Sequence, residues 1–272
     1  MQKNILSLCI LTASALAHSG FEPVGDDALA NISGQSGITI DADLYATIGS
    51  VEYTDEGSIG INNIVIGGAN KQTYFGIDWG PGSHSGNKLD GSLLTIDVLP
   101  DGDLVIAGGV DPGVGGIIDF GITTGSIQLH SANKQVTATL VDSISLSGVT
   151  TKFRMKIDAA TSHILTEAEM GISDLDIDVS SLNMKIENIF IASSNYFESK
   201  REWGPQGIAL SDIVTAIKMD MHADDDGLHI APQRLKFDMG IGSVSIADVS
   251  IGSFGLNDVD LSQMSLVISG HP

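Results

Sequence analysis

The sequence predicts an all-β fold in which mostly antiparallel, short strands form one elongated or curled, internally duplicated sheet system. Three observations support this prediction. Apolar and polar residues alternate with a period of two, Gly- and Pro-rich turns interrupt the alternation, and similar words recur in the same order at offsets of 117–125 residues. The C-terminal part also repeats an apolar pattern every five residues, which is typical of β-solenoids, so a β-solenoid is the alternative fold.

The alternation is clearest in residues 38–48 and 174–191. The first segment, ITIDADLYATI, places its apolar side chains on one face, as a strand with one buried face does. In the second segment, DLDIDVSSLNMKIENIFI, the parity slips by one at 180–181 and again at 187–188. A β-bulge or a corner produces such a slip and keeps the apolar side chains on the same face. We therefore predict kinked strands here.

Turn residues indicate that neighbouring strands are antiparallel. Residues 94–109, LTIDVLPDGDLVIAGG, read as a strand, a Pro-Asp-Gly turn and a second strand. The segment LSDIVTAIK (210–218) has apolar residues at helical spacing as well as at strand spacing. Its counterpart in the first half, LTIDV (94–98), leads directly into the proline turn, so we predict a strand for 210–218.

The chain contains two similar halves. YFGIDWGPG (74–82) and YFESKREWGPQG (196–207) each follow an apolar strand, and further matched words come after each of them in the same order. Repeated β units that cannot bury their faces alone stack into a common core. We therefore predict β repeat 1 over 38–149, a connector over 150–161 and β repeat 2 over 162–272, all in one continuous structural domain.

The N-terminus has the features of a secretory signal. Residues 1–17 contain one lysine, a short apolar run and a final Ala-Leu-Ala, so we expect a cleaved signal peptide. Residues 18–37 form an N-terminal segment with one turn of helix, in which Leu29 and Ile32 share a face and Gly34 ends the helix. We interpret this turn as a cap over one end of the β structure. A docking or sorting signal for an export partner is the alternative.

Composition excludes several classes of function. Without Lys3, 12 basic side chains face 34 acidic ones, a net charge of −22, so a nucleic-acid partner is not expected. Beyond the signal there is no run of about 18 apolar residues, so the mature chain is not expected to span a membrane as a helix. The one cysteine, Cys9, lies within the predicted signal, which leaves the mature chain without thiol chemistry.

Two sets of residues are candidates for a binding site. Carboxylates in turns are hard oxygen ligands, so calcium is a possible cofactor, against the alternative of solvated turn acids. The acids concerned are Asp101 and Asp103 in one half and Asp224, Asp225 and Asp226 in the other. Aromatic side chains on loops can bind a partner, or they can fold back and seal the core. These aromatic residues are Tyr74, Phe75, Trp79, Tyr196, Phe197 and Trp203.

No motif indicates catalysis, and we do not expect an enzyme. GPGSHSG (80–86) resembles a nucleophile elbow, but His84 occupies the place of the serine. The seven histidines are not clustered at the spacing of metal ligands. Apart from calcium, no cofactor is predicted.

The segment DDALANISGQSGITIDADLYATIGSVEYTD (26–55) resembles the mature N-terminus of FilA-like pilus-system proteins of Gram-negative bacteria. This resemblance implies an exported, β-rich protein that works with fibre or adhesion machinery. It brings no catalytic residues with it. The protein partners that it implies are those of an envelope or pilus assembly.

We therefore expect an exported, non-enzymatic protein of the periplasm, outer-membrane surface or extracellular space, with a structural or adhesion role. The alternative is a carrier that binds a lipid or another hydrophobic ligand in a β groove. The surroundings of four apolar side chains distinguish the two functions. If these side chains face an open lumen, the carrier is favoured, and if they face a second sheet, the structural role is favoured. This set comprises Leu175, Ile177, Leu182 and Met184.

Overall fold

The computed structural model describes residues 37–78, 86–110, 117–134, 137–204 and 207–270, almost all of which lie in strands and their turns. The first half contains β1 (Ile38–Leu44), β2 (Ala46–Thr54), β3 (Ser58–Gly67), β4 (Thr73–Tyr74), β5 (Ile77–Asp78), β6 (Leu89–Val98), β7 (Leu104–Val110), β8 (Ile118–Thr124), β9 (Ile127–His130), β10 (Thr137–Val141) and β11 (Ser143–Ile157). The second half contains β12 (Ile164–Val179), the 3-10 turn η1 (Ser180–Leu182), β13 (Met184–Ser193), α3 (Tyr196–Trp203), α4 (Leu210–Ile213), β14 (Thr215–Asp224), β15 (Gly227–Ile246), β16 (Val249–Asp260) and β17 (Leu266–Ile268). Within these residues, no helix has the length and apolar character needed to cross a membrane.

The predicted all-β class is confirmed. A 15-stranded sheet contains every described strand except β4 and β5, which pair with each other. The pairings are antiparallel, so the sheet differs from a β-solenoid, whose coils stack as parallel strands. The predicted hairpin at 94–109 is also present as β6 and β7. Its turn closes with a bond from the Gly102 N–H to the Leu99 carbonyl at 2.9 Å, and Gly102 has a φ of +92°.

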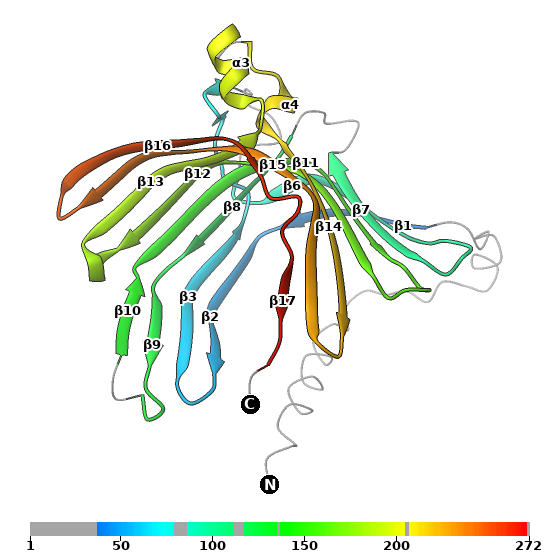
Figure 1. The fold of residues 1–272 in the computed structure, drawn as a ribbon, viewed down its shortest axis with the longest axis horizontal. Helices are drawn as coiled ribbons and strands as arrows, with labels where there is room; N and C mark the ends of the chain where they lie inside the picture. Colours follow the sequence, from blue (N-terminus) through cyan, green and yellow to red (C-terminus); the bar gives the residue numbers. More distant parts are fainter. Residues whose placement is uncertain (1–36, 79–85, 111–116, 135–136, 205–206, 271–272) are drawn as a thin grey trace. The chain divides into compact units, whose positions relative to one another are not determined.

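The strands of the large sheet fan out in two directions, which we call wing 1 and wing 2 (Figure 1). Wing 1 begins with β2 and β3. The two short strands β8 and β9 both pair with β3, and they in turn pair with β11 and β10 respectively. The wing then continues from β11 through β12, β13 and β15 to β16. Wing 2 runs in the order β1, β6, β7, β11, β12, β14, β15 and β17. Three long strands therefore cross from one wing to the other, namely β11, β12 and β15.

Matching strand pairs occur in the two halves of the chain. In β3 and β8, Val65 pairs with Thr123 and Ile66 with Ile122. Adding 125 to each β3 residue number and 117 to each β8 residue number gives two pairs that also exist, in β13 and β15. These pairs are Phe190 with Gly240 and Ile191 with Met239. The same two offsets relate the pair Ile59–Leu129, in β3 and β9, to the pair Met184–Ile246, in β13 and β15. These registers support the duplication, which stays a prediction.

A bend crosses wing 1 at equivalent places in the two halves. Asn63 in β3 has a φ of +50°, and Asn188 in β13 has a φ of +56°. Each asparagine faces a glycine of the neighbouring segment, Gly125 in the link between β8 and β9 and Gly242 in β15 respectively. Met184 and Ile186, before Asn188, have even numbers, whereas Ile189 and Ile191, after it, have odd numbers, and the pairing of β13 with β15 continues across the bend without a register shift. The predicted slip at 187–188 is therefore a bend inside β13, whereas the slip at 180–181 is η1.

The prediction of a strand over all of 210–218 is wrong for its first residues. Leu210–Ile213 form α4, and β14 begins only at Thr215. The side chain of Asp212 accepts a bond from the Ala209 N–H at 2.9 Å, which closes the start of this turn. Ile213 is fully buried, so the helical spacing of apolar residues reflects packing onto the core. The segment 196–203, expected as a loop, is also helical and forms α3.

The hydrophobic core is small and lies where the chain crosses between the wings. Residues 68–88 connect β3 to β6, and residues 194–214 connect β13 to β14. The buried core cluster draws mainly on these two connections and comprises Tyr74, Phe75, Ile117, Val149, Ala192, Tyr196, Ile208, Ile213 and Val214. Because residues of both chain halves share this cluster, neither half has a complete core of its own.

Candidate functional site

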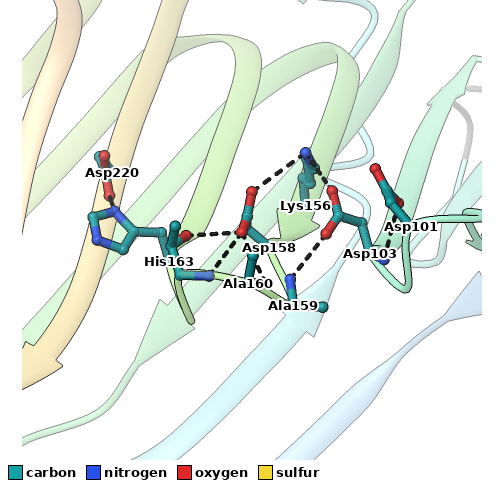
Figure 2. A network of polar contacts seen from close by, with 9 residues as sticks. Asp101, Asp103, Lys156, Asp158, Ala159, Ala160, His163 and Asp220 are labelled. Atoms are coloured by element: carbon teal, nitrogen blue, oxygen red, sulfur yellow. Dashed lines mark hydrogen bonds and ion pairs between the residues drawn. The ribbon is translucent and has the colours of Figure 1, made fainter.

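The acidic turn between β6 and β7 is already bound to a lysine (Figure 2). Asp103 is only 4% exposed and forms an ion pair with the ammonium group of Lys156. Its Oδ1 also accepts a bond from the Ala159 N–H at 2.9 Å. The hydrogen bond from Lys156, together with that from Ala159, lowers the pKa of Asp103. The negative charge of this carboxylate is therefore balanced by protein groups. The side chain of the nearby Asp101 accepts a hydrogen bond from the Asp103 N–H at 3.2 Å.

The acidic turn between β14 and β15 is more exposed. Asp224, Asp225 and Asp226 are all exposed. The Oδ1 atom of Asp224 accepts a bond from the Asp226 N–H at 2.9 Å and lies 2.9 Å from Nε2 of His229. The bond from the Asp226 backbone, followed by that from His229, lowers the pKa of Asp224.

The two predicted calcium turns do not form a common site. The loop between β11 and β12 separates them, and Figure 2 shows its residue Asp158 between Asp103 and His163. The side chain of Asp158 lies 3.6 Å from Lys156 and accepts a bond from the Thr161 N–H at 2.9 Å. Within the described ranges, no group of three or more potential metal ligands contains Asp101 or Asp103.

Three histidines from separate segments of the chain stack beside the second acidic turn. His163 precedes β12, His222 lies in β14 and His229 lies directly opposite His222 in β15. The ring centroids of His163 and His222 are 4.4 Å apart, and those of His222 and His229 are 4.7 Å apart. The expectation that the histidines do not cluster is therefore wrong for these three. His163 is distant from His222 in sequence, and the pairing of β12 with β14 brings them together, whereas His222 and His229 flank the turn between β14 and β15.

The stacked histidines and their carboxylate partners can act as metal ligands. Nδ1 of His163 lies 2.8 Å from Oδ1 of Asp220, and His229 pairs with Asp224. Two groups have their ligand atoms within 4.8 Å of one another, and both include His222. Imidazole nitrogens and carboxylate oxygens are the ligands that Zn²⁺ takes, whereas Ca²⁺ takes oxygen ligands alone. Parallel rings direct their nitrogens along parallel lines, so binding would require the rings to tilt.

The predicted partner-binding aromatics lie mostly in the core. Tyr74 is fully buried and donates a hydrogen bond at 2.9 Å to the buried Asp119, and burial raises the pKa of Tyr74. Tyr196 is 3% exposed, and its ring meets that of Phe75 edge-on at 5.7 Å. Phe197 is half-buried against the same cluster.

The remaining predicted residues lie outside the described parts of the chain. Trp79 and the N-terminal set of Leu29, Ile32 and Gly34 belong to ranges that the structure does not describe. Trp203 ends α3, but its side chain is not among those described.

The most exposed large apolar residues include those of the two outermost strands of wing 1. On β16, Val249, Ile251, Phe254 and Leu256 are between 53% and 66% exposed. On β2, Val51 is 50% and Tyr53 is 67% exposed. In the described part of the chain, β16 pairs only with β15 and β2 only with β3. Each strand therefore presents an open edge with apolar side chains, a feature that usually invites strand addition.

The four apolar residues chosen to distinguish a carrier from a structural protein are partly exposed. Leu182 is 62% exposed, and Leu175, Ile177 and Met184 are half-buried. No second sheet covers them among the residues described, where the one other sheet is the β4–β5 pair. An open cleft of about 630 Å³ at the tip of wing 1 is lined by Tyr53, Ile59 and Leu129 together with polar residues.

Comparison with known proteins gives one match. Residues 1–100 match a family of unknown function, DUF6160, and this range ends just after β6. No curated protein and no solved structure matches the chain.

Proposed function

We propose that this chain is an exported, non-enzymatic structural component of a cell-envelope or surface assembly, and that it associates through the edges of its sheet. One observation carries this proposal. The strands β2 and β16 have an unpaired edge among the described residues and expose large apolar side chains. Open, apolar strand edges are avoided in proteins that remain monomeric, because they pair with other chains.

Three sequence features agree with this proposal. The predicted signal peptide directs the chain out of the cytoplasm. The resemblance of residues 26–55 to FilA-like pilus-system proteins implies fibre or adhesion machinery as the partner. The net charge of −21 makes protein partners much more favourable than nucleic acid.

Fractionation of a Gram-negative host that expresses the tagged chain tests this proposal. We expect the protein in envelope fractions or at the cell surface, starting at His18 by intact-mass measurement. After chemical cross-linking in the cell, it should run in species larger than a monomer. A chain that keeps Met1, or that stays in the cytoplasm as a monomer, would contradict the proposal.

A specific observation favours a second function, that of a carrier for a lipid or another hydrophobic ligand. Among the residues that the structure describes, no second sheet covers Leu182 and its apolar neighbours, and a cleft opens between Tyr53, Ile59 and Leu129. Native mass spectrometry of the protein purified from envelope fractions tests this alternative. A bound lipid that is lost when Leu129 is replaced by Asp would favour the carrier over the structural role.

A further inference from the structure

We propose that the partner of the open edges is a second copy of this chain, and that β16 of one copy adds to β2 of the next. This inference rests on the proposed function, since it names the partner in the assembly. It follows from the junction between the two halves of the chain, where the strand that corresponds to β16 pairs with the strand that corresponds to β2.

The internal junction joins the last strand of the first half to the first strand of the second half. These strands, β11 and β12, pair antiparallel, with Ile144 opposite Ile177 and Leu146 opposite Leu175. All four side chains are half-buried there. A last strand is therefore a suitable neighbour for a first strand in this fold.

The strand β16 occupies the place in the second half that β10 and β11 occupy in the first. The pairing of β9 with β10 skips Leu140, between the pairs Gln128–Thr139 and Ile127–Val141. The pairing of β15 with β16 skips Ile251 in the same way, between the pairs Ser245–Ser250 and Val244–Gly252. This shared irregularity identifies β16 as a last strand, and among the described strands it has no counterpart to the neighbour that β11 has in β12.

The registers further along align the apolar residues of the two last strands. Ile144 pairs with Thr124, and Leu146 pairs with Ile122. The counterparts of Thr124 and Ile122, 117 residues later, are Ile241 and Met239. Their partners are Phe254 and Leu256, respectively. Phe254 therefore corresponds to Ile144, and Leu256 corresponds to Leu146.

The strand β2 occupies the place in the first half that the end of β12 occupies in the second. Val51 pairs with Ile61, and Ile177 pairs with Ile186, the residue 125 positions after Ile61. Val51 therefore corresponds to Ile177, and its first strand, β2, pairs only with β3 among the described strands. Transferring the junction register to two molecules places Phe254 of one copy opposite Val51 of the next.

This pairing would cover side chains that are now exposed. Phe254 is 54% and Val51 is 50% exposed, whereas their counterparts Ile144 and Ile177 are half-buried at the internal junction. The contact is head-to-tail, because β2 and β16 are different surfaces of the same chain. Such contacts produce either a closed ring or an open fibre, depending on the rotation between copies.

Disulfide trapping tests the proposed register. Val51→Cys and Phe254→Cys are placed in separate chains, each with Cys9→Ser, which removes the one natural cysteine. Opposed residues of antiparallel strands have Cα atoms about 4.5–5.5 Å apart, a distance that a disulfide can span. Mixing the two variants under mild oxidation should trap a cross-linked dimer. Either variant alone should give only background, because neither position faces itself.

A matched control uses Val98→Cys with Phe254→Cys, since Val98 is 71% exposed but lies in β6 of wing 2. We expect on the order of tenfold more cross-linking for Val51 with Phe254, because pairing raises the local thiol concentration. Equal yields for the two mixtures would overturn the proposal. Dimers of Phe254→Cys alone would overturn it as well, since they require a symmetric contact of β16 with β16.

The N-terminal segment is a competing occupant of the edge, and one further variant tests it. This variant carries both Leu29→Cys and Val51→Cys. If it closes an internal disulfide and forms no cross-link to Phe254→Cys, the edge of β2 is covered by the N-terminal segment of the same chain. Failure of the proposed function is a separate result. Envelope complexes without Val51–Phe254 cross-links leave the function intact, whereas cross-links in a chain that is never exported leave the self-pairing intact.

Discussion

Asn63 and Asn188 occupy matching bends of the sheet, 125 residues apart, and both adopt a positive φ inside a strand. Each packs against a glycine, Gly125 between β8 and β9 or Gly242 in β15. Asparagine is among the few residues that tolerate this backbone region, and glycine leaves room for the close approach of a bent strand.

The first prediction concerns Gly242. A Cβ atom at this position would lie 2.8 Å from Cβ of Asn188, closer than real Cβ contacts. We expect Gly242→Ala to lower the free energy of unfolding by about 1–3 kcal/mol through overpacking. Gly49→Ala is the matched control, because nothing lies within 4 Å of its added Cβ. Urea denaturation measures both, and equal midpoints for the two variants would argue against a close contact at the bend.

The second prediction concerns the pH dependence of stability at Asp103. Lys156 and the Ala159 N–H lower the pKa of this carboxyl group in the folded state. Its stabilising contribution is therefore complete above the unfolded pKa of about 3.9 and is lost as the pH falls through the folded pKa. Asp103→Asn should lower the Tm at pH 7 and flatten the fall of Tm below about pH 4.

Asp101→Asn serves as the control for this prediction, since Asp101 is exposed and has no ion pair with Lys156 among those found. Thermal melts between pH 7 and pH 2 measure both variants. If Asp103→Asn follows the wild-type Tm at every pH, the ion pair with Lys156 does not stabilise the fold.

The third prediction concerns metal binding at the stacked histidines. Zinc should raise the Tm by mass action, and EDTA should reverse the shift. Calcium should have a smaller effect, because the cluster offers imidazole nitrogens and the two acidic turns do not converge. His222→Ala should abolish the zinc shift, since His222 belongs to both candidate groups. His130→Ala, outside both groups, should retain it, and a loss in both variants would exclude this cluster as the site.

The sequence was sufficient to predict the β class, the hairpin at 94–109 and the bend at 187–188, because each depends on local chemistry. Alternation reports which face is buried, a Pro-Asp-Gly turn closes a hairpin, and a parity slip requires a bend. Words matched in the same order, at offsets of 117–125 residues, also have the same pairing registers in the structure, at Ile66–Ile122 and Ile191–Met239.

The features that sequence reasoning missed depend on contacts between distant segments. The four residues of α4 have apolar spacing that fits both a helix and a strand, and only burial of Ile213 in the shared core decides between them. His163 and His222 become neighbours through strand pairing, which their positions in the chain do not reveal. The pairing of Lys156 with Asp103 likewise joins the end of β11 to a turn that is distant in sequence.

Sedimentation velocity over a range of protein concentrations, at low and moderate salt, tests the central claim most directly. Wild-type protein should form larger species as its concentration rises, and more so at moderate salt, which screens the repulsion between chains of charge −21. Val51→Lys should remain monomeric, because a lysine on an edge strand opposes strand addition, whereas Val98→Lys should associate like the wild type. A wild-type chain that stays monomeric throughout, or a Val51→Lys chain that associates as well as Val98→Lys, would contradict pairing through β2 and β16.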